Sequence, residues 1–317
     1  MIRLALLRHG HTAWNRAGRI QGHTDEPLDD EARKQLSDLS LPDQWSEANL
    51  VSSPLSRAVE TANIVTGRSP HIQKDLIEIG GEPTDFSPYG VHWKGNPGAL
   101  DLIKARKIGV QDEGSQLVAE VFAKAADGSS WLDLCAGPGG KAALLSSIAR
   151  ERNIKFTANE ISAARAELVS QVVHGDRVLV LDGRTISSLS EKFDAILIDA
   201  PCTGLGALRR RPEVRWRRTL QDLRALTQLQ RELVDSAIEA LNPGGVLGYA
   251  TCSPHLAETS IQIADIKKKH TGLQQLPVDE YLPSSLHDAT RDGAMSLWTH
   301  KHGTDAMYLA LFRKDNG

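Results

Sequence analysis

Between residues 130 and 253, short apolar segments alternate with stretches of helical periodicity, and this alternation constrains the fold more than any other feature. The segments that predict strands are WLDLC (131–135), IKFTANE (154–160), RVLVLD (177–182), FDAILIDA (193–200) and GVLGYATCS (245–253). The stretches that predict helices are 140–151, 162–173 and 219–241. Buried strands that alternate with helices are typical of an α/β fold with a doubly wound, mostly parallel sheet. AMYLALFRK (306–314) predicts a final edge strand.

A glycine-rich turn, LDLCAGPGGK (132–141), follows the first of these strands and opens a helix. Its glycines let backbone amides approach a ligand at a helix N-terminus, although a tight structural turn has the same composition. Glu160 ends the next strand, 20 residues after Gly140, where an acid meets the ribose hydroxyls in dinucleotide folds. Asp182 ends the third strand. Each acid alone is more often a cap or turn residue, but together with the turn they predict a cofactor site.

All three cysteines of the chain fall in motifs at strand ends: Cys135, Cys202 in LIDAPCTGLG and Cys252 in YATCSP. A lone cysteine is usually a small buried hydrophobic residue, but three at strand ends are hard to assign to packing. No pair has the short spacing of zinc ligands, so we expect no metal ion. The odd count argues against a disulfide scaffold and favours a cytoplasmic location. The opening apolar run is too short for a signal peptide, and no stretch predicts a membrane span.

Residues 1–80 contain a shorter α/β pattern with its own motifs. It predicts strands at 2–9 and 49–53 and helices at 29–39 and 54–65. RHGHTAWN, GRIQGHTDEPLDDEA and SSPLSRAVETA resemble, in order, the histidine phosphatase (phosphoglycerate mutase-like) superfamily. The resemblance implies that His9 is the nucleophile, that Arg8 and Arg57 bind phosphate and that Glu78 donates a proton.

This N-terminal segment is predicted to be a truncated phosphatase domain. The superfamily's site also needs a second histidine from a later strand, in a domain roughly twice this length. His174 in QVVHGDRV is a candidate, but it falls between two strands of the other sheet, where a surface loop is the favoured interpretation. The Gly- and Pro-rich stretch 80–98 breaks helix and strand and predicts a connector. We therefore expect three regions: a phosphatase-like fragment (1–80), a connector with lead-in (81–110) and a second domain (111–317).

The second domain resembles the Sun-family RNA cytosine-5 methyltransferases, most of all the bacterial 16S rRNA enzymes. The matching motifs, over about residues 85–313, are GVQDEGSQLVA, LDLCAGPGGK, DAPCTGLGALRRRPEVRWRR, NPGGVLGYATCS and HGTDAMYLALFRK. The resemblance implies a Rossmann-like class I methyltransferase domain that binds S-adenosyl-L-methionine. Ala306 departs from the family's usual glycine, and the phosphatase-like segment replaces the family's N-terminal RNA-binding region.

The resemblance also implies which residues act. The cofactor would be held by Cys135, Ala136, Gly137, Pro138, Gly139, Gly140, Lys141, Glu160, Asp182 and Asp199. Cys252 would be the nucleophile that adds to C6 of cytosine, with its thiol pKa lowered by a following helix N-terminus. Asp199 would hold or protonate the N3 edge of the base, and Cys202 would help to remove the C5 proton and release the enzyme. The target base must leave its stack, so the expected substrate is single-stranded or distorted RNA.

RRRPEVRWRR (209–218) is the candidate RNA-binding segment. The chain has a formal net charge of −3, so RNA binding requires a local basic patch. The six arginines are Arg209, Arg210, Arg211, Arg215, Arg217 and Arg218, with Trp216 among them. A charge run is usually only a solvated surface, but this one directly follows the DAPC motif, which favours phosphate contacts beside the site.

The predicted function is S-adenosyl-L-methionine-dependent methylation of C5 of cytosine in RNA, with rRNA as the expected target class and no membrane partner. Two other functions remain open at this point. One is phosphoryl transfer by the N-terminal segment, and the other is RNA binding without catalysis. The sequence does not indicate an oligomeric state.

Overall fold

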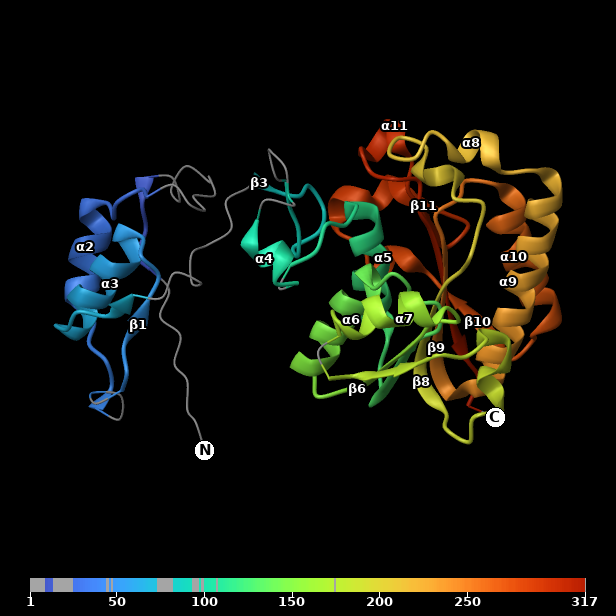
Figure 1. Ribbon diagram of the computed structural model, residues 1–317, viewed down its shortest axis with the longest axis horizontal. Coiled ribbons are helices and arrows are strands. Elements are labelled where there is room, and N and C mark those ends of the chain that lie inside the picture. Colours follow the sequence, from blue (N-terminus) through green and yellow to red (C-terminus); the bar gives the residue numbers. More distant parts are fainter. Residues whose placement is uncertain are drawn as a thin grey trace. The chain divides into compact units, whose positions relative to one another are not determined.

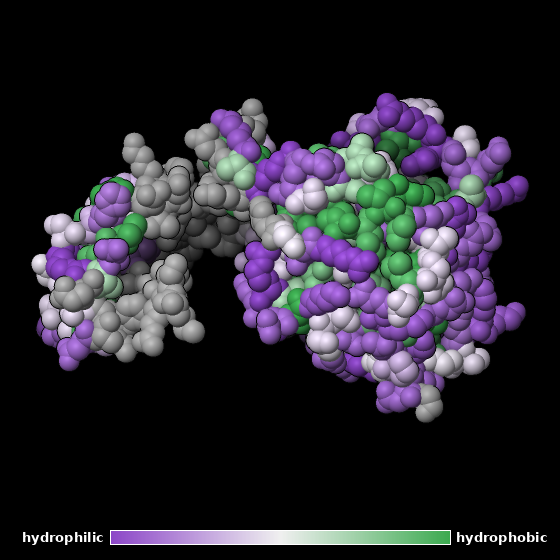
Figure 2. Space-filling model, turned by 60° about the horizontal axis from the view of Figure 1, so that its bottom comes forward, coloured by the Kyte–Doolittle hydropathy of each residue, from purple (hydrophilic) through white to green (hydrophobic). Residues whose placement is uncertain are grey.

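The computed structural model describes residues 9–13, 25–43, 46, 48–72, 82–92, 97, 100–106, 108–173 and 175–316. The chain divides into two compact units, Met1–Gly95 and Asn96–Gly317, so the division falls inside the predicted connector 81–110 (Figure 1). On the face drawn in Figure 2, unit 2 is mainly hydrophilic, with a hydrophobic area enclosed by polar residues. None of the helices in the described part is long and apolar enough to cross a membrane.

Unit 1 contains a small parallel β–α–β motif. Strands β1 (Val51–Ser52) and β2 (His71–Ile72) pair in parallel and are connected through helix α3 (Ser56–Thr66), and helix α2 (Asp30–Ser37) packs on α3. The side chain of Asp29 caps α2 by accepting from the Ala32 N–H at 2.8 Å. The core consists of Leu28, Leu36 and Val65, with Leu41 and Ile64 against it. The predicted helices 29–39 and 54–65 are thus confirmed, whereas the predicted strand 2–9 lies outside the described residues except for His9.

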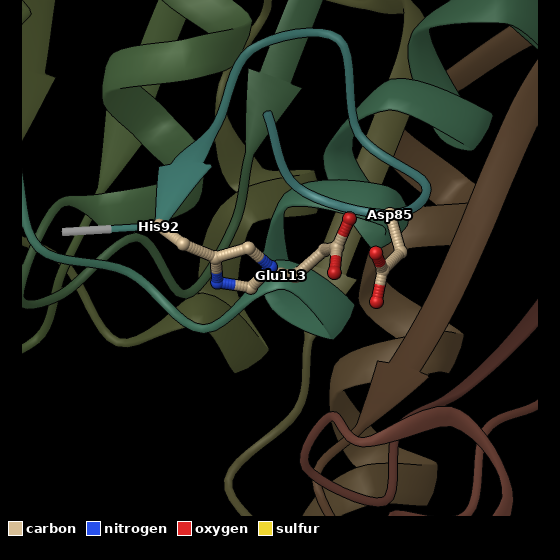
Figure 3. A group of neighbouring side chains, drawn as sticks. All are labelled: Asp85, His92 and Glu113. Carbon is tan, nitrogen blue, oxygen red and sulfur yellow. The ribbon is translucent and has the colours of Figure 1, made fainter. Parts of the chain in front are cut away.

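A two-stranded antiparallel hairpin follows in unit 1, within the predicted connector, whose Gly and Pro content was expected to break helix and strand. Strands β3 (Glu82–Pro83) and β4 (Val91–His92) pair with Glu82 opposite His92. Asp85 lies in the loop between the strands and His92 at the end of β4 (Figure 3). The expectation that this stretch contains no strand was wrong. In a sheet of two strands both are edge strands, and a proline such as Pro83 is tolerated in an edge strand.

Unit 2 contains a nine-stranded sheet in the described part of the chain, with the order β11-β12-β13-β9-β8-β5-β6-β7 and with β10 also paired to β13. The strands are β5 (Ser130–Asp133), β6 (Lys155–Asn159), β7 (Arg177–Leu179), β8 (Phe193–Asp199), β9 (Leu241–Thr251), β10 (Leu273–Leu276), β11 (Thr290–Arg291), β12 (Ala294–Ser296) and β13 (Tyr308–Lys314). Strands β5 to β9 are parallel. The chain runs outward from β5 through β6 to β7 and then returns to β8 on the other side of β5. The predicted doubly wound sheet is therefore confirmed, with its switch point between β5 and β8.

Strand β13 is not the edge strand that the sequence predicted. It pairs antiparallel with β9 over Tyr308–Arg313 and also with β10 and β12. Its side chains are buried from Tyr308 to Phe312, which agrees with an interior position. The strands that pair with it on its other side, β12 and β10, are only three and four residues long and therefore show little periodicity in the sequence.

Helices cover both faces of this sheet (Figure 1). Helix α5 (Glu113–Ala125), whose first residue Glu113 is drawn in Figure 3, packs with α6 (Gly140–Glu151). Helix α9 (Leu220–Ala240) packs with α10 (Ser260–Lys269) and against β8 and β9. Side chains of β5 alternate between the two layers: Trp131 meets Phe122 of α5, and Leu132 joins the core under α9.

The remaining elements of unit 2 are short and lie mostly in the loops. They are α4 (Asp101–Lys104), α7 (Ala163–Ser170), η4 (Gly183–Ser188), η5 (Leu205–Ala207), α8 (Val214–Arg217), η6 (Leu256–Glu258), η7 (Val278–Glu280), η8 (Ser284–Ala289) and α11 (Thr299–His302). The loops after β5, β6, β8 and β9 meet at the carboxyl edge of the parallel strands. Ligands bind at this edge in open α/β sheets.

Candidate active site at the carboxyl ends of the strands

The glycine-rich turn connects β5 to α6 as the sequence predicted. Gly139 has a φ of +117°, and a Cβ there would lie 2.7 Å from the Val172 side chain. A Cβ on Gly137 would lie 2.2 Å from a carboxylate oxygen of Glu160. Only glycine fits these two positions, so the backbone of the turn passes close to the end of β6.

Glu160 directly follows β6 and is 3% exposed. Its Oε2 accepts from the Gly137 N–H at 3.1 Å and is paired with Arg165 at 3.1 Å, while its Oε1 accepts from the Ser162 N–H at 3.0 Å. The carboxylate therefore links the turn after β5 to the loop after β6. An ionised carboxylate has about four acceptor positions, so capacity remains for a further donor.

Asp182 lies beyond the end of β7, not at its last residue as predicted. Its side chain caps η4 by accepting from the Arg184 N–H at 3.0 Å and is paired with the Arg184 guanidinium at 2.6 Å. The hydrogen bonds from Arg184 lower the pKa of Asp182. Its role in the described structure is thus that of a capping residue.

A buried ion pair joins α6 to β8. Lys141 Nζ lies 2.8 Å from Asp199 Oδ2, and Lys141 is 8% exposed. Burial lowers the pKa of Lys141, but the Asp199 carboxylate more than offsets this effect, and the pKa is raised. The sequence placed both residues at the site but contained no local signal for their pairing.

Asp133, the last residue of β5, is fully buried close to this pair. Desolvation raises the pKa of Asp133 to about 7, the charge of Asp199 adds to the rise, and Lys141 opposes it. The sequence motif LDLC did not distinguish this acid from an ordinary strand residue.

Cys202 and Cys252, which are 50 residues apart in the sequence, lie side by side with their Sγ atoms 3.4 Å apart. They are brought together by the parallel pairing of β8 and β9, in which Asp199 is opposite Ala250. The sequence predicted both cysteines at the carboxyl ends of strands that adjoin the strand with the glycine-rich turn, and the structure brings the two sulfur atoms into contact. β9 neighbours β8 rather than β5, so only β8 adjoins the strand with the glycine-rich turn.

The pKa values of the two thiols are shifted in opposite directions. The hydrogen bond with Cys202 lowers the pKa of Cys252 and outweighs its burial and the charge of Asp199, which both raise it, while the charge of Lys141 lowers it further. The same hydrogen bond, together with burial, raises the pKa of Cys202. The sequence predicted that a helix N-terminus after TCSP would lower the pKa of Cys252. This expectation was wrong in its cause, because a three-residue η6 follows and the effect comes from Cys202.

Gly206 connects three loops of the site and was missed by sequence reasoning. Its N–H donates to the Cys252 carbonyl at 2.9 Å, and its carbonyl accepts from the Ala306 N–H at 3.0 Å. A Cβ at Gly206 would lie 2.1 Å from the Ala306 carbonyl oxygen. Ala306, the departure from the family pattern, therefore contacts the site through its backbone, which a methyl side chain does not alter.

The six arginines of 209–218 do not form one uniform patch. Arg209 is paired with Asp112 at 2.9 Å, and Arg210 is paired with Asp305 through two hydrogen bonds. Arg218 Nε donates to the Thr203 carbonyl at 3.2 Å, next to Cys202.

The other three arginines of the segment are exposed. Arg211, Arg215 and Arg217 have no acidic partner within 4 Å among the described residues, and Arg215 stacks on Trp216 with its guanidinium 5.3 Å from the ring centroid. Trp216 is 81% exposed. This half of the segment offers cations and an aromatic face to solvent.

In unit 1, the described phosphatase-like residues are His9 and Arg57. The His9–Gly10 segment is bonded to the helix that carries Arg57, because the Gly10 N–H donates to Thr61 Oγ1 at 3.0 Å. His9 Nδ1 lies 2.7 Å from the Gly10 carbonyl oxygen, and Arg57 is fully buried. The other two predicted residues, Arg8 and Glu78, lie outside the described residues, as does His174.

Two family models match this sequence. The family described as 16S rRNA methyltransferase RsmB/F matches residues 121–313, and the histidine phosphatase superfamily (branch 1) matches residues 4–127. Both resemblances drawn from the sequence are confirmed. The second match runs past the predicted end of the fragment at residue 80 and overlaps the first in α5.

Curated relatives and solved structures agree with the first match. The putative methyltransferase Rv1407 of Mycobacterium tuberculosis is 48% identical over 237 residues, covering 72% of this chain and 51% of the relative. Ribosomal RNA small subunit methyltransferase B of Vibrio cholerae is 34% identical, covering 71% and 53%. The structure of NSun6 from Pyrococcus horikoshii with SFG is 26% identical, with a TM-score of 0.60 and coverage of 70% and 56%. The chain spans about half the length of the curated relatives it matches.

Proposed function

The chain belongs to the 16S rRNA methyltransferase RsmB/F family, and on that premise we propose that it transfers a methyl group from S-adenosyl-L-methionine to C5 of cytosine in RNA. Ribosomal RNA is the proposed target class, because relatives named as ribosomal RNA small subunit methyltransferases share the domain. The proposal concerns unit 2.

The contact between Cys202 and Cys252 carries this proposal. The two sulfur atoms lie 3.4 Å apart at the edge of the sheet where ligands bind. The pKa of the Cys252 thiol is lowered and that of the Cys202 thiol is raised, so Cys252 is the stronger acid of the two. A nucleophile and a separate proton-transfer group are what covalent addition to a pyrimidine needs. The ion pair beside the thiols acts on Cys252 through both of its members, with Asp199 raising and Lys141 lowering the pKa of the thiol.

The residues around the glycine-rich turn fit the proposed cofactor. The turn leaves no room for side chains at Gly137 and Gly139, and Glu160 retains acceptor capacity for a hydroxyl group. The cofactor would be held by the turn residues 135–141 and by Glu160, Asp182 and Asp199. When bound, S-adenosyl-L-methionine supplies an electrophilic methyl group.

Each residue of the site then has a distinct task. The Cys252 thiolate forms a bond to C6 of the cytosine, and the electron pair displaced from the C5–C6 double bond makes C5 nucleophilic. Asp199, held in place by Lys141, binds the N3 edge of the base. After C5 has been methylated, Cys202 gives up its own proton to solvent and its thiolate takes the C5 proton. The electron pair of the C5–H bond re-forms the C5–C6 double bond, and Cys252 leaves C6 as a thiolate.

Transfer of a labelled methyl group to RNA tests the proposal. The purified chain is incubated with labelled S-adenosyl-L-methionine and total RNA from a matched cell extract, and the RNA is digested to nucleosides. We expect label in 5-methylcytidine and none with Cys252→Ala. Label in another nucleoside would refute C5 specificity. RNA binding without any label would favour the non-catalytic alternative.

A further inference from the structure

A buried hydrogen-bond network ties the loop after β8 to the loop after β9 through Glu258. Thr203 follows Cys202, Ser253 follows Cys252, and their hydroxyl oxygens lie 3.1 Å apart. Thr203 donates its backbone N–H to Glu258 Oε1 at 2.8 Å and its hydroxyl to Oε2. Glu258 has no exposed surface, and Thr203 and Ser253 are 3% and 1% exposed. The Glu258 carboxylate, at the end of η6 in the loop that follows Cys252, therefore holds the loop of Cys202.

Residues from the sheet and from α9 complete this network. Gln230 donates to Glu258 Oε1 at 3.2 Å and to the Pro201 carbonyl at 2.9 Å. Tyr249 donates its hydroxyl to the backbone carbonyl of Glu258 at 2.9 Å. Three donors on the side chain suit an ionised carboxylate, whose burial is costly unless it is hydrogen-bonded. The network thus keeps a negative charge behind the cysteine pair.

The two cysteines face different charges. The groups that act on Cys252, besides Cys202, are Lys141, Asp199, Asp305 and Arg210. Those that act on Cys202, besides Cys252, are Glu258, whose charge raises the Cys202 pKa, and the Gly204 N–H, whose hydrogen bond lowers it; Tyr249 is a neutral neighbour. Both cations and anions act on Cys252, whereas the charge that acts on Cys202 is the Glu258 anion, which favours the thiol at Cys202.

We propose that Glu258 is a positioning residue that decides which cysteine of the pair is the thiolate. Its charge, anchored to the backbone next to Cys202, keeps the shared proton on Cys202, which donates it to the sulfur of Cys252 at 3.4 Å. The pair releases one proton to solvent and retains the other. The inference rests on the proposed function, in which Cys252 is the nucleophile. It explains why the nucleophile is Cys252 rather than Cys202.

Alkylation of the two cysteines in the reduced full chain tests the inference without RNA or cofactor. The chain is treated with iodoacetamide between pH 5 and pH 10, and each cysteine is quantified by mass spectrometry of its peptide. In the unmodified chain, Cys252 should react at lower pH than Cys202. In Glu258→Gln, which keeps the size and most hydrogen bonds but removes the charge, the rate ratio of Cys252 to Cys202 at pH 7 should fall by about tenfold, the effect of one pKa unit. An unchanged ratio in folded Glu258→Gln would overturn the inference.

Two variants separate the charge from the packing of the network. Tyr249→Phe removes a hydroxyl from the same network and leaves the charge, so its alkylation ratio should stay close to that of the unmodified chain. Glu258→Asp retains the charge and should restore much of the ratio. A fall in Tyr249→Phe as large as that in Glu258→Gln would assign the effect to packing and refute the role of the charge.

A second measurement does not depend on the folding of a Glu258 variant. In the double variant Cys135→Ser/Cys252→Ser, Cys202 is the remaining cysteine, and its thiolate absorbance should titrate well above the usual cysteine pKa of about 8.5, because Glu258 remains in place. A midpoint at or below that value would refute the inference. Because neither assay requires methyl transfer, failure of the proposed function would be seen separately as a chain that shows the expected alkylation ratio but does not methylate RNA.

Discussion

The two sulfur atoms at the strand ends are in contact yet differ in proton affinity, so single substitutions can separate their roles. Cys252→Ala should abolish methyl transfer and form no covalent complex with RNA. Cys202→Ala should still allow attack by Cys252 but stall release, leaving a denaturant-resistant protein–RNA band on a gel. The assay is best run above neutral pH, because loss of the Cys202 hydrogen bond raises the pKa of Cys252. A band in Cys252→Ala and none in Cys202→Ala would mean that the roles are reversed.

Asp133 predicts a pH dependence of stability. Its pKa in the folded state is about 7, well above the usual value of about 3.9 for an unfolded chain. The folded state therefore binds this proton more tightly, and its stability falls as the pH rises from about 4 to about 7, by on the order of 1 kcal/mol for each pH unit. Above about pH 7 the loss is complete.

Replacement of this acid tests the dependence. Asp133→Asn should unfold at nearly the same urea concentration as the unmodified chain near pH 4 and at a higher one at pH 8. Asp279→Asn, which changes an exposed acid, serves as the matched control and should show no such trend. A constant difference between Asp133→Asn and the unmodified chain across this range would contradict the raised pKa.

At the scale of elements, segment 209–218 divides into a structural and a solvent-facing part. Arg209 and Arg210 neutralise the buried acids Asp112 and Asp305, whereas Arg211, Arg215 and Arg217 remain exposed. Replacing the exposed three by Gln should weaken RNA binding and reduce the slope of log affinity against log salt by about 2, if each contacts one phosphate of a single strand. Fluorescence anisotropy at several salt concentrations measures both quantities.

A matched control removes three charges at the other end of the parallel strands. Lys267, Lys268 and Lys269 lie in the last turn of α10, on the exposed surface. Their triple replacement by Gln should leave the salt slope unchanged, and an equal reduction would show that only net charge matters. Arg209→Gln should instead lower thermal stability, because the Asp112 carboxylate, whose side chain is 4% exposed, loses its partner at 2.9 Å and keeps only the more distant Arg210 at 4.0 Å.

At the scale of the whole molecule, the two family matches overlap in α5, and the fold assigns this helix to unit 2. The phosphatase match extends to residue 127, but α5 packs against α6 and its residues Leu117 to Ala123 are fully buried there. A phosphatase domain built by the same residues would have to remove this helix from the methyltransferase core. We therefore expect hydrolysis of a generic phosphate ester to be absent or residual. Robust hydrolysis that is lost in His9→Ala, with methyl transfer unaffected, would refute this prediction.

Much of the element order could be predicted from the sequence because its signals are local. Each signal depends on a few neighbouring residues: a run of apolar residues, a change to helical periodicity, or a glycine-rich turn. Strands β5 to β9 and helices α6, α7 and α9 lie where these signals occur. The same signals placed the turn residues, Cys202 and Cys252 at strand ends. These signals did not predict that β13 lies inside the sheet or that β3 and β4 form a hairpin. The position of β13 depends on partner strands that are distant in the sequence, and the hairpin strands are too short to show a pattern.

The sequence alone thus determined which side chains arrive at the carboxyl edge of the sheet, and the tertiary structure decided which of them meet. The contact of Cys202 with Cys252 follows from the register of β8 against β9, and the charge behind Cys202 comes from Glu258, which no motif marked. Likewise, pairing with Asp112 and Asp305 removed two of the six arginines from the candidate RNA surface. The physical reason is that strand register and ion pairing are set by the free energy of packing the whole unit, whereas periodicity and turn composition are properties of short segments.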